Sequence, residues 1–203
     1  ADTSGNYQEW LDTAVPQRNY IKIHTNDQRV TGDTPESNGS YIDWEGTCAF
    51  KESRGTYHYS YYGFNRFPTY RANGWVGNIT QFSKEENDLL QAEANLHLGN
   101  IPEAVELINR SRTENGGLDL IDASTVSVGS MADHRSINGS LWAMLKYEKG
   151  LEMLAINPGT GYTDRRGWGT LVSGTILHYP VPGEELQLMD EEIYTIGDDE
   201  GET

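Results

Sequence analysis

The chain has 203 residues, one cysteine and a formal net charge of -16, so it is long enough to bury a core without disulfide or metal staples. Residues 184–203 hold nine of the acidic side chains and no basic one. This balance disfavours nucleic acid and anionic membrane surfaces as partners, because both bind proteins through basic surfaces. The apolar runs are much shorter than the roughly 20 residues of a membrane-spanning helix, so we expect no membrane insertion.

The chain begins with Ala1 and Asp2, and its single cysteine is Cys48. An Ala-Asp start fits cleavage after the small residues of a signal peptide, and a trimmed chain is the alternative. One cysteine excludes an internal disulfide and a Cys-x-x-Cys motif. The five histidines are scattered without metal-ligand spacing, so we expect neither a metal nor a cofactor.

Residues 1–80 are expected to form a strand- and loop-rich part. Apolar and polar side chains alternate over 19–25, which predicts a strand. Residues 47–52 and 56–62 flank a turn around Gly55, and this pattern predicts a β-hairpin.

The run 86–104 is the strongest helical signal in the chain. Apolar side chains recur along it every three or four residues, and Ser83 with Glu86 forms a capping-box pattern. Gly99 lies at the expected turn, and Pro102 falls where the first turn of a helix tolerates proline. These features predict two helices joined by a tight turn.

A third helix is predicted over 140–154, and Pro158 ends it. Weaker signals predict a helix that starts at Ser130 and a short helix after Asp164. The buried stripe of the third helix is expected to consist of Leu141, Met144, Leu145, Leu151 and Leu154.

These elements predict an α+β fold with three parts in one compact unit. The strand- and loop-rich residues 1–80 pack with helical hairpins in 81–189. Residues 190–203 form an acidic tail that contains one short β-like segment.

Three segments, in order, resemble the C-terminal half of the SusD/RagB family, the surface glycan-binding proteins of Bacteroidetes-type bacteria. Residues 86–112 match the family's "LL-AEA-LGN-EA-IN-R" hairpin. Residues 145–169 match its "ER-EL" helix and "FDLRRWG" segment, and residues 178–186 match its closing "YPIP-EL". The resemblance implies tetratricopeptide-like helices, no enzymatic activity, and a secreted protein that is extracellular or lies at the bacterial cell surface.

Two departures accompany this resemblance. Family members are usually more than twice as long and carry a lipid-anchor cysteine at the mature N-terminus, whereas this chain begins at Ala1 and has its cysteine at Cys48. The loops that supply glycan-contacting aromatic side chains in the family are largely missing or replaced here. The resemblance therefore implies the scaffold more strongly than it implies glycan binding.

The charged side chains leave several alternatives open. Arg165 and Arg166 could cradle a sugar or a carboxylate, but we favour buried ion pairs between them and Glu148 or Glu152. The acidic residues 198–202 could collect calcium, and a solvated tail is the favoured alternative. A carboxylate pair for glycoside hydrolysis stays open as well, although no pair is singled out.

Aromatic side chains and glycosylation motifs supply the remaining candidates. Aromatic rings can stack on the flat faces of sugars. One group of aromatic side chains could therefore either bind a glycan by stacking or pack in the core: Trp44, Trp75, Tyr57, Tyr59 and Tyr61. Attached glycans are a second possibility, because four Asn-x-Ser/Thr sequons occur and Asp12-Thr13-Ala14 resembles an O-glycosylation motif of Bacteroidetes-type bacteria. The acceptors would be Thr13, Asn38, Asn78, Asn109 and Asn138.

Two functions from different classes follow. The first is a non-enzymatic, self-assembling subunit of an extracellular filament or surface layer, in which a terminal strand pairs with the next copy. The alternative is a surface glycan-binding protein of a SusC/SusD-type nutrient uptake system. Expected partners are thus other copies of the chain, or glycans. The candidate donor residues for strand pairing are Ile193, Tyr194, Thr195, Ile196, Tyr7 and Trp10.

Overall fold

The chain divides into two compact units, Ala1–Pro158 and Gly159–Thr203. The division lies inside the range 81–189 that the sequence analysis assigns to one helical part of a single unit. The predicted α+β class is confirmed, because helices dominate the described residues and one two-stranded antiparallel sheet accompanies them. The computed structural model describes residues 5–18, 21–46, 61–156, 160–177 and 181–193.

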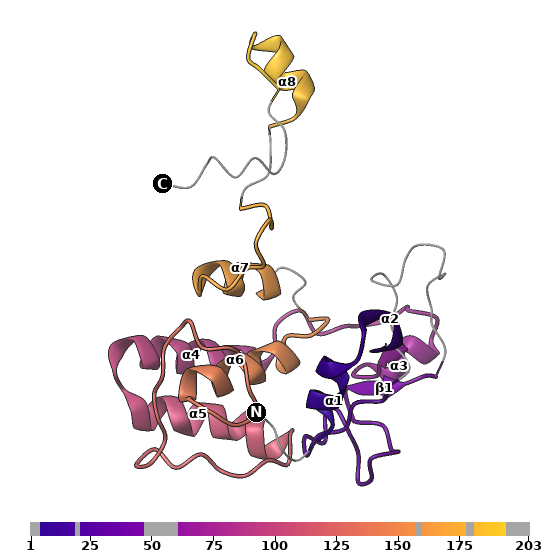
Figure 1. Cartoon of the computed structure of the whole chain (residues 1–203), viewed down its shortest axis with the longest axis vertical. Helices are drawn as coiled ribbons and strands as arrows, with labels where there is room; N and C mark the ends of the chain where they lie inside the picture. The colour runs from indigo at the N-terminus through magenta and orange to yellow at the C-terminus, as the bar shows by residue number, and fades with distance from the viewer. Residues whose placement is uncertain (1–4, 19–20, 47–60, 157–159, 178–180, 194–203) are drawn as a thin grey trace. The chain divides into compact units, whose positions relative to one another are not determined.

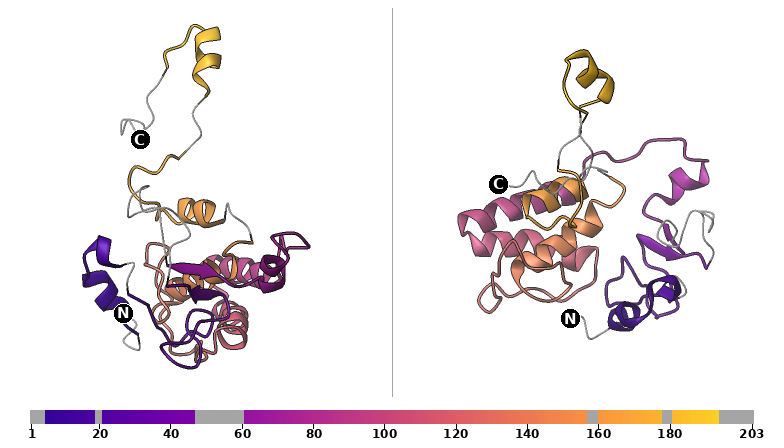
Figure 2. Two further views of the ribbon diagram at one scale, coloured as in Figure 1. Left: turned by 90° about the vertical axis from the view of Figure 1, so that its right-hand side faces the viewer. Right: turned by 45° about the horizontal axis from the view of Figure 1, so that its top comes forward.

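Three helices form the centre of the first unit, and they lie side by side in Figures 1 and 2. They are α4 (Lys84–Leu98), α5 (Ile101–Glu114) and α6 (Leu141–Glu152). Only two residues separate α4 from α5, so these two form the predicted helical hairpin.

The local signals that predicted this hairpin are confirmed. The Ser83 side chain accepts a hydrogen bond from the backbone N–H of Glu86 at 3.1 Å, which caps α4. Gly99 ends α4 with a φ of 78°, a left-handed conformation that favours glycine. Pro102 lies in the first turn of α5.

The apolar core of the first unit comes from these helices and the loops that follow them. The His97 ring meets the buried Trp142 ring edge-on, with centroids 5.0 Å apart. Leu154, expected in the buried stripe of the third helix, is exposed beyond the end of α6. The buried apolar side chains of the three helices are Leu89, Ala92, Leu96, Ala104, Val105, Leu107, Ile108, Leu141, Trp142, Ala143, Met144 and Leu145.

The predicted helix start at Ser130 is wrong. The segment forms a turn, in which the Asp133 carboxylate accepts hydrogen bonds from the Ser130 N–H and from the Ser140 hydroxyl. The Ser140 hydroxyl also accepts from the Ala143 N–H and caps α6. The Ser130–Asp133 pattern therefore supports the start of α6 rather than a helix of its own.

Short elements make up the described N-terminal part. Two strands, β1 (Ile42–Trp44) and β2 (Tyr62–Phe64), pair antiparallel with Ile42 opposite Phe64. The predicted hairpin of 47–52 and 56–62 lies almost entirely outside the described residues, because 47–60 are not described; the described end of its second strand, Tyr62, pairs with Trp44 of β1. Residues 21–25 form no strand. The helices here are α1 (Tyr7–Asp12), α2 (Val15–Arg18) and α3 (Pro68–Ala72).

The described side chains of residues 21–46 include no buried apolar one. Among the described residues, every buried apolar side chain lies at Leu89 or later, whereas the buried side chains of residues 21–46 are polar or charged. They include Asp27, Arg29 and Thr31. The buried side chains through which residues 21–46 meet the helices are therefore polar or charged among the described residues.

The second unit contains α7 (Thr160–Gly167) and α8 (Gly183–Leu188). The Tyr162 hydroxyl donates to the Ile176 carbonyl at 2.6 Å. Leu186 is the only buried apolar side chain among the unit's described residues. No helix in the part of the chain that the structure describes has the length and apolar character of a membrane span.

Candidate functional site

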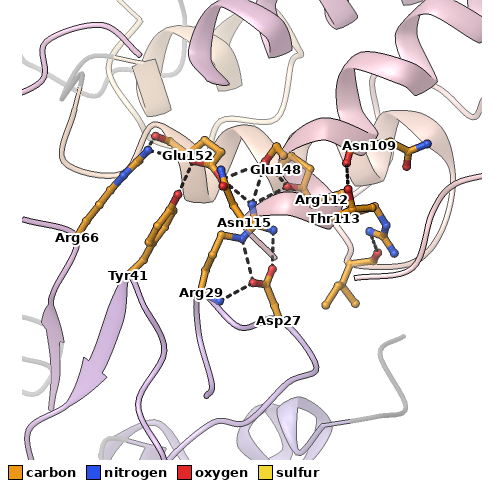
Figure 3. A network of polar contacts seen from close by, with 12 residues as sticks. Asp27, Arg29, Tyr41, Arg66, Asn109, Arg112, Thr113, Asn115, Glu148 and Glu152 are labelled. Atoms are coloured by element: carbon orange, nitrogen blue, oxygen red, sulfur yellow. Dashed lines mark hydrogen bonds and ion pairs between the residues drawn. The ribbon is translucent and has the colours of Figure 1, made fainter. Parts of the chain in front are cut away.

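A buried network of ion pairs joins the N-terminal part to α6 (Figure 3). Arg29 lies at its centre and is fully buried. Its Nη2 lies 2.6 Å from Oδ2 of Asp27, and its Nη1 lies 2.6 Å from Oε2 of Glu148 and 2.9 Å from Oε1 of Glu152. One guanidinium thus contacts three carboxylates that are themselves excluded from solvent.

Glu152 collects further partners from three segments of the first unit. Nη2 of Arg66 lies 3.0 Å from its Oε2, and the Tyr41 hydroxyl donates to the same oxygen at 2.9 Å. The Asn115 amide donates to Oε1 at 3.0 Å, and the Ser111 hydroxyl lies 3.0 Å from that oxygen. Both carboxylate oxygens of Glu152 are therefore fully occupied.

The Glu148 carboxylate accepts fewer hydrogen bonds than the Glu152 carboxylate does. Its Oε2 accepts from Arg29 and from the Ser111 hydroxyl at 2.7 Å, but its buried Oε1 has no hydrogen-bond partner among the described residues. Burial raises the pKa of Glu148, and the Arg29 hydrogen bond and charge oppose that rise. The cluster holds three carboxylates and two guanidiniums, Arg29 and Arg66, and so carries one surplus negative charge. Because Glu148 has the carboxylate oxygen without a described hydrogen-bond partner, its negative charge is the least stabilised of the three.

The other ionisable groups of the network respond to the same burial. Desolvation lowers the pKa of Arg29, but its hydrogen bonds to Asp27 and Glu148, together with their charges, outweigh that effect and raise the pKa above its ordinary value. Burial raises the pKa of Tyr147, and the Asp27 charge raises it further. Burial and the Glu152 charge raise the pKa of Tyr41. These groups keep their charge states near neutral pH, and the closed, paired geometry gives the network a structural role.

The sequence analysis correctly expects buried ion pairs at Glu148 and Glu152 but names the wrong cations. Arg165 and Arg166 are exposed side chains of α7 in the second unit. The cation at the centre of the network, Arg29, comes from a loop 119 residues before Glu148, where no periodic pattern marks it.

A polar cavity of about 580 Å³ lies beside this network in the first unit. Residues 24–26, 28 and 31–35 of a loop line one part of it, and residues 117–119 and 137–138 line another. Arg112 organises the second part, because its guanidinium donates to the carbonyls of Asp119 and Ile137, both at 2.7 Å. Burial lowers the pKa of Arg112. The volume suits a small ligand.

The structure brings together only part of the predicted aromatic platform. The Trp44 ring stacks on Tyr61 with centroids 5.5 Å apart and meets Tyr62 edge-on at 5.0 Å. Trp75 contacts the Tyr70 ring instead, at 6.0 Å. Tyr57 and Tyr59 lie outside the described residues.

The two segments predicted to donate a strand differ in the structure. Tyr7 and Trp10 belong to α1, so the segment 7–11 is helical and does not form an extended donor; the Arg18 guanidinium covers the Trp10 ring at 4.8 Å. Ile193 is exposed at the end of the described C-terminal segment. Tyr194, Thr195 and Ile196 lie outside the described residues.

The predicted glycosylation sites differ in their accessibility. Asn38, Asn78 and Asn138 are exposed, and Asn138 also accepts from Arg112 at 3.1 Å. The Thr13 hydroxyl donates to the Glu9 carbonyl at 2.8 Å. Asn109 lies within α5, and its amide both donates to and accepts from the backbone of Ile121, which gives this residue a structural role.

The second unit carries exposed apolar side chains that the sequence analysis recognised only at Ile193. We call the exposed apolar residues of 181–193 the C-terminal surface. Leu188 is 83% exposed and Met189 is 58% exposed. The C-terminal surface consists of Val181, Leu188, Met189 and Ile193.

Within the described residues, no group of three or more His, Cys, Asp or Glu side chains is arranged to hold a metal ion. No protein-family model, curated protein or solved structure matches this chain. The SusD/RagB resemblance therefore stays a prediction from the sequence motifs.

Proposed function

We propose that this protein is a non-enzymatic, secreted subunit that assembles with copies of itself into an extracellular filament or surface layer, and that its C-terminal surface crosses the interface. The observation that carries the proposal is an imbalance among the described residues of the second unit, where Leu186 is the one buried apolar side chain and the four residues of the C-terminal surface are exposed.

The energetics of that unit favour a partner. Burying a large apolar side chain contributes about 1.5–3 kcal/mol, and units of about 40 residues seldom fold stably without metals, disulfides or association. Exposed apolar side chains that lie close together also mark interaction sites on monomers. Docking on another copy would remove Leu188 and Met189 from water and stabilise the second unit at the same time.

Charge opposes this association and makes it dependent on salt. The second unit holds ten acidic and two basic residues, which gives it half of the chain's net charge of -16. Two like-charged copies repel one another until salt shortens the screening length, which is about 10 Å at 0.1 M. We therefore expect stronger association at higher ionic strength.

The buried network supports a scaffold role rather than a catalytic one. The carboxylates of Glu148 and Glu152 are fully buried and face guanidinium groups instead of the cavity. The resemblance of the hairpin and α6 to the SusD/RagB scaffold favours the same interpretation and favours secretion.

Light scattering coupled to size-exclusion chromatography tests the proposal over a concentration and salt series. We expect the mass of the wild-type protein to rise with both, and the Leu188→Glu, Met189→Glu double variant to remain monomeric. Leu120→Glu is the matched control, because Leu120 is a 73% exposed apolar residue of the first unit. A wild-type protein that stays monomeric throughout would refute the proposal.

The polar cavity favours a second candidate function, the binding of a small neutral glycan. Asn26, Asp33 and Asn138 line it, and amide and carboxylate groups of this kind hydrogen-bond hydroxyls. In a glycan-binding assay, we expect the Asn26→Ala, Asp33→Ala double variant to lose affinity and Trp44→Ala to keep it. The reverse result would move the site to the Trp44–Tyr61 stack.

A further inference from the structure

Four asparagine residues of this chain are followed directly by glycine. They are Asn38, Asn73, Asn115 and Asn138, and all four dipeptides lie within the described residues. Asparagine is a chemically labile residue, because the backbone nitrogen of the next residue can attack its side-chain carbonyl carbon. A glycine in that next position has no Cβ to hinder the attack. The four dipeptides share this chemistry, so a difference in their reactivity must come from the fold.

The fold engages the attacking nitrogen at three of these dipeptides. The N–H groups of Gly39, Gly74 and Gly116 donate to backbone carbonyls at 2.9 Å, 3.1 Å and 3.3 Å, respectively. The amide nitrogen of Asn115, which would leave during the reaction, also donates to the Glu152 carboxylate at 3.0 Å. These hydrogen bonds must break before the reaction can proceed at these three dipeptides.

The dipeptide of Asn138 and Gly139 lacks this protection. Among the described residues, the Gly139 N–H and the Asn138 amide nitrogen have no hydrogen-bond partner. Both residues are exposed. The heavy atom nearest to the position that a Cβ on Gly139 would take lies 3.6 Å away, so neighbouring side chains leave room around this backbone nitrogen.

Arg112 supplies a positive charge to the carbonyl that would be attacked. Its Nη2 donates to Oδ1 of Asn138 at 3.1 Å. Attack on Cγ of Asn138 moves negative charge onto this oxygen, and a fixed donor stabilises charge that develops there. The guanidinium is fixed because Nε and Nη1 donate to the carbonyls of Asp119 and Ile137, both at 2.7 Å.

We propose that Asn138 and Gly139 form a site of deamidation through a succinimide. The Gly139 nitrogen forms a bond to Cγ of Asn138 and gives up its proton. The bond from Cγ to Nδ2 breaks, and Nδ2 leaves with that proton as ammonia. Water then adds to either carbonyl of the succinimide ring and opens it, which leaves aspartate or isoaspartate at position 138.

The aspartate product changes the wall of the polar cavity. Asn138 and Arg112 both line this cavity, and no carboxylate of the described residues forms an ion pair with Arg112. A carboxylate in place of the Asn138 amide accepts the guanidinium N–H in a charge-assisted hydrogen bond, which is stronger than one to a neutral acceptor. The cavity wall thus loses an amide donor and gains a negative charge.

Peptide mass spectrometry of the folded wild-type protein tests the site. The protein is incubated at mildly alkaline pH and digested, and the conversion of each Asn-Gly peptide is followed over time. We expect Asn138 to convert about tenfold faster than the other three, because one backbone hydrogen bond that must break first slows the attack by up to about that factor. In a urea-denatured control, we expect similar rates at all four dipeptides.

Two results would overturn the proposed site. Conversion in the folded protein that is equal at all four dipeptides, or fastest at Asn38, Asn73 or Asn115, would show that the fold does not select Asn138. A converted Asn138 peptide that contains aspartate without isoaspartate would exclude the succinimide, because water opens that ring at both carbonyls.

Asn138→Asp tests the ion pair with Arg112 separately. We expect its urea denaturation midpoint at neutral pH to lie above that of the wild type. Asn78→Asp is the matched control, because it adds the same charge at an exposed asparagine and should leave the midpoint close to the wild-type value. A midpoint of Asn138→Asp at or below that of the control would exclude the pairing.

Discussion

Removal of the Arg29 guanidinium tests whether the buried network holds the first unit together. In an Arg29→Leu variant, Asp27, Glu148 and Glu152 would remain buried without their central cation. Breaking a buried ion pair by removing one partner costs about 3–5 kcal/mol. Because whole domains unfold with about 5–15 kcal/mol, we expect this one substitution to remove much of the stability of the first unit at pH 7.

The stability that the Arg29→Leu variant loses should be smaller at lower pH. Arg29 lowers the pKa of Glu148 against the effect of burial, so its loss raises that pKa further. The folded variant then binds more protons than the unfolded chain, and its stability rises as the pH falls. We expect the difference in the free energy of unfolding between the variant and the wild type to be smaller at pH 5 than at pH 7, by about 1 kcal/mol or more.

Urea denaturation followed by tryptophan fluorescence measures these values, because Trp142 lies buried in the helical core. Arg110→Leu is the control: Arg110 also contacts two carboxylates, but its side chain is 40% exposed, so we expect little loss of stability. Arg29→Lys retains the charge without the guanidinium fork and should lie between the two. A loss below about 1 kcal/mol for Arg29→Leu, or one that does not change with pH, would refute the reasoning.

Three further substitutions test individual features by the same denaturation assay. The folded-state pKa of Glu148 is raised, so the stability that Glu148 contributes is fully present below its unfolded pKa of 4.5 and is lost as the pH rises through the folded pKa. Glu148→Gln leaves the network with equal numbers of positive and negative charges and should flatten this decline of stability with pH. A variant whose stability depends on pH as the wild type's does would contradict the prediction. Gly99→Ala should destabilise α4 by about 1 kcal/mol, because its φ is 78°, and a neutral effect would argue against the left-handed turn. Ser83→Ala should cost about 1 kcal/mol through the lost cap, whereas Ser83→Asp should retain most of the stability.

The helical hairpin was predictable because its signals are local. The capping side chain of Ser83, the turn glycine and Pro102 each act within a few residues of the helix end that they define. The same holds for the third helix and its Ser140 cap. Propensity and spacing over one or two turns suffice for such features.

The ion-pair network was predictable only in part. Glu148 and Glu152 continue the helical spacing of Leu141 and Leu145, so a buried pair of carboxylates could be expected on α6. Arg29 lies in a loop with no periodicity, and only the tertiary fold brings it to α6. The strand predicted over 19–25 was wrong for a similar reason: residues 21–25 form no strand, since local alternation does not by itself supply a neighbouring strand to pair with.

The junction between the N-terminal part and the helices is ionic, and this property affects how the molecule opens. Separating Arg29 and Arg66 from Glu148 and Glu152 would hydrate charges while exposing little apolar surface, because no described residue before Leu89 buries an apolar side chain. The heat-capacity change and the denaturant dependence of such an opening would both be small. Amide hydrogens of residues 27–46 would therefore exchange through an opening that urea scarcely accelerates, whereas those of α4–α6 would exchange only through global unfolding.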